Sequence, residues 1–174
     1  IRSVIFALLI LALARPQAGE RSEEISTFGV DIILCMDTST SMRAEDFKPN
    51  NRYYVAKEVA KEFVKGRKHD RIGVVVFSAV AFTQCPLTLD YGACLDFLDK
   101  TEIGMTQTDG TAIGIALTTS TNRFRDSLAK SKVIILLTDG RNNMGEIDPV
   151  TASKVAATMG IKIYAIGIGV PGGA

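Results

Sequence analysis

Short apolar segments, separated by longer stretches of helical spacing, constrain most strongly how this chain of 174 residues can fold. The segments carry almost no polar residues on either side, and they lie at residues 30–36, 71–78, 133–137 and 161–168. Strands that are apolar on both faces are typical of a parallel sheet that helices cover on both sides. We therefore predict one α/β domain with a doubly wound, mainly parallel sheet and a short edge strand at residues 79–83.

The stretches between these strands are predicted to be helices. Val55, Val59 and Phe63 recur at helical spacing in residues 51–65, and Gly66 follows as a natural C-cap. Further helices are expected to begin at Thr111 and after the capping residues Asp90 and Asp148. The sequence ends directly after the last predicted strand, so we expect a closing helix or a further strand to be missing.

The composition excludes several classes of function. The 20 basic and 19 acidic residues are interspersed, so no nucleic-acid-binding surface is indicated. Cys35, Cys85 and Cys94 form neither a CxxC pair nor a zinc-finger spacing, and we interpret them as free thiols, with Cys35 in the core. The single histidine, His69, lies in a charged stretch and is expected at the surface.

An uninterrupted apolar run at residues 4–14 precedes the predicted domain. It is shorter than the roughly 20 apolar residues of a membrane span, but the chain starts with isoleucine, so upstream residues can complete a transmembrane helix. A cleaved signal peptide and a buried core helix are the rival interpretations. We predict three parts: a partial transmembrane helix (1–15), a juxtamembrane linker (16–27) and the α/β domain (28–174).

Carboxylates follow two of the predicted strands. Asp37 ends the first strand, and Asp139 follows the strand at residues 133–137. With the common strand order 3-2-1-4-5, these two strand ends lie side by side, at the place where open sheets bind ligands. Ser39 and Ser41 are two residues apart, so in an extended segment both hydroxyls would point toward the place that Asp37 faces.

This combination of residues favours a hard cation. Two carboxylates and several hydroxyls, with no histidine or cysteine nearby, form an all-oxygen environment. Such an environment suits Mg²⁺ best, with Mn²⁺ or Ca²⁺ as alternatives. Because Mg²⁺ retains water readily, few direct protein ligands are expected and one position can stay open.

The pattern Asp37-x-Ser39-x-Ser41, a later threonine and Asp139-Gly140 resembles the metal-ion-dependent adhesion site (MIDAS) of von Willebrand factor type A (vWA) domains. DxSxS alone is a weak pattern, but its combination with Thr-Asp-Gly at a second strand end is specific. Residues 13–17, 44–47 and 82–91 are also similar to bacterial Bat aerotolerance proteins, the BatA type in particular. The resemblance covers nearly the whole chain and implies the Rossmann-like vWA fold.

The resemblance implies a role for each residue of the motif. Ser39, Ser41 and Thr111 would coordinate the metal ion through their hydroxyls, with Thr106 and Thr108 as competitors for the threonine position. Asp37 and Asp139 would act mainly through bound waters. Carboxylates held one shell out leave the cation short of negative charge, so it attracts an acidic side chain from a protein partner.

Two residues depart from the family pattern. Thr40 stands where glycine is frequent, which narrows access to the cation. Arg141 stands where glutamate is common in the Bat group, which makes the local charge less negative and weakens metal binding.

The resemblance also implies a non-catalytic module of the bacterial inner membrane. The N-terminal helix would anchor it, with one or several spans in the full protein, and the vWA domain would lie on the extracytoplasmic side. A MoxR-type AAA+ ATPase and sister vWA proteins are the implied partners, in a complex linked to stress or oxygen tolerance. The residues themselves do not decide the topology, because Arg2, Arg15 and Arg21 flank the apolar run on both sides.

Several plainer interpretations stay open. Serine and threonine at strand ends are often turn residues or helix caps, and Thr111 can be the N-cap of the helix that follows it. Asp46 and Asp109 are expected to be solvated loop acids rather than metal ligands. The glycines at 167, 169 and 172 match GxGxxG, but no helix follows them, which argues against a dinucleotide site.

The strongest enzymatic alternative is a metal-dependent phosphotransferase or phosphatase that uses Asp37 as its nucleophile. Such an enzyme normally has a second acid two residues on, where this chain has Ser39. A serine hydrolase is disfavoured, because no GxSxG motif is present and His69 lies away from the predicted crevice.

Overall fold

A computed structural model of the chain describes residues 29–169. In that part of the chain, five strands form one sheet in the order β3-β2-β1-β4-β5. The strands are β1 (Asp31–Asp37), β2 (Arg71–Phe77), β3 (Ala81–Thr88), β4 (Lys132–Thr138) and β5 (Ile161–Gly167). β1 pairs in parallel with β2 and β4, and β4 pairs in parallel with β5. The predicted fold class and strand order are therefore confirmed.

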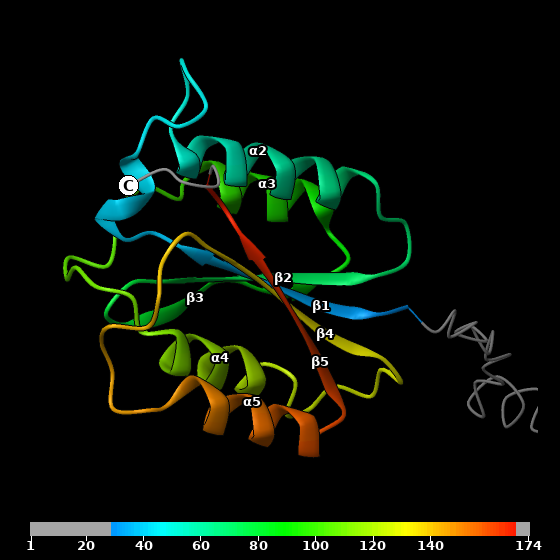
Figure 1. Cartoon of the computed structure of the whole chain (residues 1–174). Helices are drawn as coiled ribbons and strands as arrows, with labels where there is room; N and C mark the ends of the chain where they lie inside the picture. The colour runs from blue at the N-terminus through cyan, green and yellow to red at the C-terminus, as the bar shows by residue number, and fades with distance from the viewer. Residues whose placement is uncertain (1–28, 170–174) are drawn as a thin grey trace, which may run out of the picture.

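Helices cover both faces of the sheet. A short 3-10 helix, η1 (Thr40–Arg43), follows β1, and the longer helices are α2 (Arg52–Lys65), α3 (Tyr91–Asp99), α4 (Ile113–Asn122) and α5 (Pro149–Thr158). α2 and α3 lie on one side of the sheet, and α4 and α5 lie on the other (Figure 1). Two clusters of buried apolar residues fill the two layers between sheet and helices.

The central strand explains why the core has two halves. Successive side chains of a strand point to opposite faces, and every residue of β1 is buried. Leu34 and Met36 belong to the cluster beneath α2 and α3, whereas Ile33 and Cys35 belong to the cluster against α4 and α5. The prediction that Cys35 is a core residue is confirmed, and His69 is exposed as expected.

The edge strand differs from its prediction in length and position. β3 covers residues 81–88 instead of 79–83, and it runs antiparallel to β2. The turn between the two strands is closed by the Ser78 amide, which donates to the Val80 carbonyl at 2.9 Å. Pro86 interrupts the apolar pattern, which is why the second half of the strand was not predicted. Proline is tolerated on an edge strand because the outer side of that strand has no neighbour to which a backbone N–H would donate.

The helix boundaries follow the predicted caps with one exception. Asp90 and Asp148 cap α3 and α5 as predicted, each with a hydrogen bond of 2.9 Å from a backbone amide, and Asn51, which was not predicted as a cap, accepts from the Tyr54 amide at 2.8 Å. The exception is the helix expected to begin at Thr111, which spans Ile113–Asn122. The predicted segments 1–15 and 16–27 lie outside the described residues. Within residues 29–169, no helix is long and apolar enough to cross a membrane.

Candidate metal site

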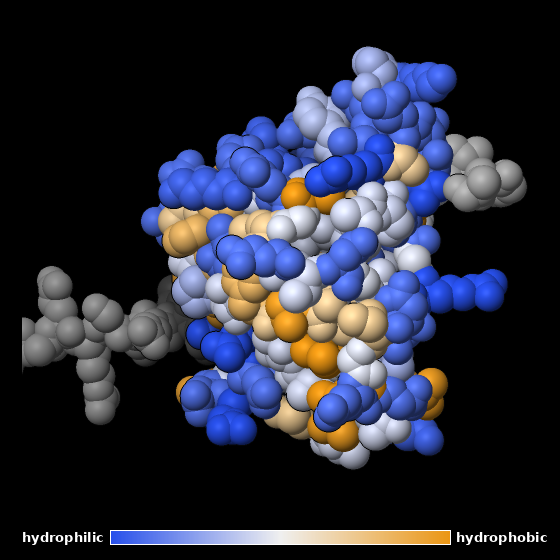
Figure 2. Space-filling view, turned by 90° about the vertical axis from the view of Figure 1, so that its left-hand side faces the viewer, coloured by the Kyte–Doolittle hydropathy of each residue, from blue (hydrophilic) through white to orange (hydrophobic). Residues whose placement is uncertain are grey.

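The two predicted carboxylates lie at the same edge of the sheet. Asp37 is the last residue of β1, and Asp139 follows Thr138, the last residue of the neighbouring β4. The Thr138 hydroxyl donates to Oδ2 of Asp37 at 2.5 Å, which links the two strand ends directly. This edge carries the loops on the left of Figure 1; it faces the viewer in Figure 2, where hydrophilic residues predominate, with smaller groups of hydrophobic ones between them.

A chain of hydrogen bonds connects the two serines to the second carboxylate. The hydroxyls of Ser39 and Ser41 lie 2.9 Å apart, and the Ser41 hydroxyl donates to Oδ1 of Asp139 at 2.8 Å. The segment is not extended as expected, because Ser41 belongs to η1 and only Ser39 keeps an extended backbone (φ −64°, ψ 160°). The 3-10 turn nevertheless brings both hydroxyls together, because its tight winding closes the distance between residues two apart.

Asp37 lies beneath this chain and is completely buried. Its Oδ1 accepts from the Ser39 amide at 2.9 Å, and its Oδ2 accepts from Thr138. Burial raises the pKa of Asp37 above its ordinary value, since desolvation penalises the charged form, and the hydrogen bonds from Thr138 and Ser39 partly oppose that shift. Asp37 therefore holds the backbone of the loop at Ser39, and both of its oxygens accept hydrogen bonds from the protein.

Thr111 reaches the site from a third loop. Its hydroxyl oxygen lies 3.4 Å from the position that a Cβ on Gly140 would occupy, so it lies against the residue after Asp139. Thr111 is not the N-cap of α4, because that position belongs to Ala112, which makes no side-chain cap. The competitors Thr106 and Thr108 hydrogen-bond to Ser78 and to each other instead of to the carboxylates.

Two asparagines that sequence reasoning missed hold the Thr111 loop in place. Oδ1 of Asn143 accepts from the Thr111 amide at 2.7 Å, and the Asn143 amide donates back to the Thr111 carbonyl at 3.1 Å. Oδ1 of Asn142 accepts from the Ile113 amide at 2.8 Å, so it caps α4 from a different loop. The sequence signal was the pair of adjacent asparagines directly after Asp139-Gly140-Arg141. No local sequence rule connects such a pair with the start of a distant helix.

An arginine that was not predicted contacts the second carboxylate. Arg52, the first residue of α2, donates from Nη1 to Oδ2 of Asp139 at 2.7 Å. Its Nε donates to Oδ2 of Asp46 at 2.5 Å, so the guanidinium bridges two acids. The Asp139 side chain is 0% exposed, that of Arg52 10% and that of Asp46 18%. Burial of an acid is tolerated when a paired charge compensates it.

The two loop acids expected to be solvated both accept hydrogen bonds; Asp109 is exposed as expected, whereas Asp46 is only partly exposed. Asp46 binds Arg52, as described above. Asp109 accepts from the Thr40 amide at 3.0 Å and from the Thr40 hydroxyl at 2.5 Å. The hydrogen bonds from Thr40 hold the pKa of Asp109 below its ordinary value. Because this bond ties the Thr40 side chain to Asp109, the threonine joins the loop after β1 to the loop before α4.

The donor set fits a hard divalent cation. The hydroxyls of Ser39 and Ser41 and an oxygen of Asp139 lie within one hydrogen-bonded chain, with Asp37 beneath and Thr111 beside it. Between residues 29 and 169, no group of three or more histidine, cysteine, aspartate or glutamate residues is arranged to hold a metal ion. A metal at this edge would therefore rely on hydroxyl ligands, a set that suits Mg²⁺ or Mn²⁺ better than a softer ion.

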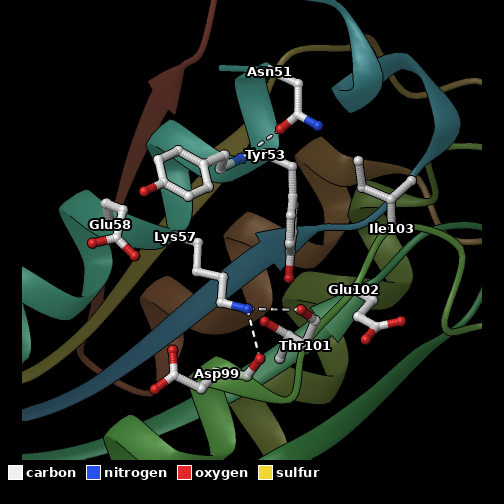
Figure 3. A pocket seen from close by; sticks show the side chains of 9 residues that line it. Asn51, Tyr53, Lys57, Glu58, Asp99, Thr101, Glu102 and Ile103 are labelled. Atoms are coloured by element: carbon white, nitrogen blue, oxygen red, sulfur yellow. Dashed lines mark hydrogen bonds between the residues drawn. The ribbon is translucent and has the colours of Figure 1, made fainter. Parts of the chain in front are cut away.

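A separate groove of about 480 Å³ lies beside α2 (Figure 3). Nζ of Lys57 donates to the carbonyls of Asp99 at 2.7 Å and Thr101 at 3.0 Å, which ties α2 to the turn after α3. Tyr53 points its ring into the same space. The groove's residues are distinct from the candidate metal ligands.

Comparison with known families decides the identity of the domain. The family model described as the von Willebrand factor type A domain matches residues 31–173. The chain belongs to this family. Domains of the vWA family are generally adhesion or interaction modules rather than catalysts.

Solved structures extend the likeness of this vWA domain to Bat proteins. An aerotolerance-related membrane protein from Bacteroides fragilis is 35% identical, with a TM-score of 0.77 over 84% of this chain and 71% of that one. A conserved hypothetical protein, BatB, from Bacteroides thetaiotaomicron is 38% identical, with the same TM-score over 84% and 70%. The Bat resemblance is confirmed at the level of the group.

A third solved vWA structure is relevant to the metal. Proximal thread matrix protein 1 from the mussel byssus, with a zinc-occupied MIDAS motif, is 31% identical, with a TM-score of 0.69 over 80% of this chain and 35% of that one. The vWA chain described here spans about half the length of the curated relatives that it matches first.

Proposed function

We propose that this vWA domain binds a divalent cation, Mg²⁺ in preference, and uses it to recruit a partner protein. Ser39, Ser41 and Thr111 would hold the cation through hydroxyl oxygens, with Asp37 and Asp139 acting mainly through water. The observation that carries the proposal is the hydrogen-bonded chain from Ser39 through Ser41 to Asp139. The zinc-occupied MIDAS of a related vWA structure supports a metal at the equivalent motif.

The combination of neutral hydroxyl ligands with carboxylates that act through water favours an incomplete coordination shell. Neutral hydroxyls contribute oxygen without charge, and Asp37 is buried with both oxygens engaged by the protein. A cation held in this way attracts an anionic ligand, so we infer that the partner supplies an aspartate or glutamate side chain. The bound cation would supply an electrostatic anchor, and the surrounding loops would supply specificity.

The membrane context is part of the same proposal. Solved relatives are described as membrane-related proteins, one of them aerotolerance-related. We propose that the N-terminal apolar run anchors the domain to the bacterial inner membrane, with the vWA domain outside the cytoplasm. A MoxR-type AAA+ ATPase and sister vWA proteins are the partners we propose for a complex in stress or oxygen tolerance.

The contacts of Asp37 argue against the phosphotransferase alternative. A nucleophilic carboxylate needs an oxygen that can reach a substrate. Both oxygens of Asp37 accept hydrogen bonds from Ser39 and Thr138, and the side chain has no exposed surface. A binding module is the function that this geometry supports best.

The test is metal binding by the whole chain, measured by calorimetric titration with Mg²⁺ and Mn²⁺. We expect Ser39→Ala to weaken binding at least tenfold, because it removes one oxygen of the hydroxyl set. Ser153→Ala, which removes a hydroxyl on α5 that bonds only within its own helix, is the matched control and should bind like wild type. Wild-type protein that binds neither ion would refute the proposal.

Partner recruitment is tested separately in membranes. Proteins that co-purify with the wild-type chain are compared with and without EDTA and with Asp139→Ala. We expect the same partner to be lost in both cases, and metal-dependent phosphatase turnover that Asp37→Asn abolishes would instead establish the enzymatic alternative.

A further inference from the structure

The charge balance of the candidate metal site includes a basic residue that the motif does not contain. Arg52 contacts Oδ2 of Asp139 at 2.7 Å, on the oxygen that Ser41 does not use. Its position is defined from two sides, because Asp46 accepts from the other edge of the guanidinium and the backbone at Gly169 lies close to it. The arginine is largely buried, so its charge is poorly screened by solvent.

The sum of charges shows what this contact does. Asp37 and Asp139 together carry two negative charges, which from one shell out reduce the attraction of a divalent cation for a further anion without cancelling it. Arg52 adds one positive charge next to Asp139 and thereby makes the loaded site more positive than the cation and its two acids alone would make it. Asp46 offsets this incompletely, because it is more exposed than Arg52 and contacts none of the candidate ligands directly.

We propose that Arg52 sets the charge of the metal site, weakening its hold on the cation alone and strengthening its capture of a carboxylate once the cation is bound. This inference rests on the proposed metal-binding function. It adds to that function a residue of α2 that makes the site select for a carboxylate ligand. Arg52 acts through Asp139 as a positioning residue and does not itself coordinate the metal.

Opposite substitutions at the two ends of the bridge make the inference testable. Arg52→Gln removes the positive charge, so the site should bind Mn²⁺ alone more tightly, on the order of tenfold, because a like charge near the cation is gone. Asp46→Asn removes the counter-charge of Arg52, so the same affinity should fall. If Arg52 only held the loops in place, breaking its bridge at either end would change Mn²⁺ affinity in the same direction.

The assay is calorimetric titration of the whole chain with Mn²⁺ in sodium chloride and in sodium acetate of matched ionic strength. Acetate stands for the partner's carboxylate, and its binding to the loaded site tightens the apparent Mn²⁺ affinity by mass action. We expect this acetate effect in wild type, a larger effect in Asp46→Asn and little or none in Arg52→Gln. Arg52→Lys keeps the charge without the forked geometry and should retain most of the effect.

Controls separate the two proposals. Lys65→Gln removes a positive charge at the far end of the same helix and should match wild type in both buffers. Wild-type protein without Mn²⁺ binding would refute the proposed function itself. Wild-type binding combined with weaker Mn²⁺ affinity in Arg52→Gln, or with an acetate effect unchanged by that substitution, would overturn the inference about Arg52 alone. Thermal melts in EDTA identify any variant that fails to fold. If Arg52→Gln fails, Asp46→Asn, which lies in a partly exposed loop, still tests the inference: weaker Mn²⁺ binding supports it and tighter binding overturns it.

Discussion

The pair Asn142 and Asn143 allows a sharp test of how the Thr111 loop is positioned. Asn143→Ala removes the acceptor of the Thr111 amide, whose hydrogen bond is 2.7 Å long and partly buried. Asn142→Ala removes the acceptor of the Ile113 amide at the start of α4, a 2.8 Å bond that is exposed. The two residues are neighbours of identical type, but only one of them holds a candidate metal ligand.

The hydrogen bond that each substitution removes sets the expected loss of unfolding free energy. A hydrogen bond contributes about 0.5–1.5 kcal/mol net, and loss of a helix cap costs about 0.5–2 kcal/mol. Both variants should therefore lose about 1 kcal/mol of unfolding free energy, which for a domain of this size lowers Tm by about 2–4 °C. Equal destabilisation makes Asn142→Ala a matched control for Asn143→Ala.

Metal binding should separate the two variants. Releasing Thr111 from Asn143 frees the hydroxyl that lies against Gly140, so we expect Asn143→Ala to weaken Mg²⁺ binding about tenfold, as disturbed supporting contacts of a metal site commonly do. Asn142→Ala should leave the Mg²⁺ affinity unchanged. Titration calorimetry and thermal melts on the same samples measure both quantities. Equal Mg²⁺ affinity in the two variants would show that Thr111 is not a ligand.

Three further predictions concern metal removal, backbone strain and alkaline pH. Mg²⁺ at about 100 times its Kd should stabilise the wild type by about 2.7 kcal/mol, raising Tm by about 5–10 °C; EDTA should abolish this rise, and an equal rise in Asp139→Ala would contradict the assigned site. Gly110→Ala should destabilise the fold by about 1–3 kcal/mol in thermal melts, because Gly110 has φ +126° and a Cβ there would lie 2.5 Å from Met144 Cγ; stability equal to wild type would refute this. Burial raises the pKa of Tyr53 to about 12, above the value of about 10 in an unfolded chain, so this group's contribution to stability is present below pH 10 and lost as the pH rises toward 12. Denaturant titrations of Tyr53→Phe should show a smaller alkaline loss, and an unchanged loss would assign it to other groups.

The sequence was sufficient to predict the sheet and the two carboxylates because each depends on local pattern. Strands without a polar face must be buried on both sides, and parallel strands place their carboxyl ends at one edge. Asp37 and Asp139 therefore lie at the same edge of the sheet, as this pattern predicts. The same reasoning missed the second half of β3, since Pro86 and Gln84 break the apolar pattern there.

The supporting contacts could not be predicted, because they join residues that are far apart in the chain. Arg52 and Asp139 are separated by 87 positions, and Asn143 and Thr111 by 32. No periodicity or spacing rule connects such residues. Their side chains meet because α2 begins beside the end of β4 and because the loop after β4 crosses the start of α4, which are consequences of packing.

The two ends of β1 show why the candidate site differs from an ordinary buried charge. Asp31 begins the strand and Asp37 ends it, and both side chains are almost completely removed from solvent. Asp31 is paired with Arg71, whose Nε donates at 2.8 Å, so a protein cation compensates its burial. In the described part of the chain Asp37 has no ion pair and receives only neutral donors from Ser39 and Thr138.

A buried carboxylate without a cationic partner costs stability, and its pKa is raised accordingly. Arg52 lies at the same edge of the sheet but makes its ion pairs with Asp139 and Asp46, so among the described residues Asp37 accepts only from the Ser39 amide and the Thr138 hydroxyl. An arginine pairs with Asp31 at one end of β1, so an arginine paired with Asp37 at the other end would also be compatible with this fold. We infer that the protein leaves the charge of Asp37 uncompensated because a cation from solution compensates it. Asp37→Asn removes this charge and keeps the shape of the side chain. The variant should therefore gain stability in EDTA and lose the Mg²⁺-dependent rise in Tm.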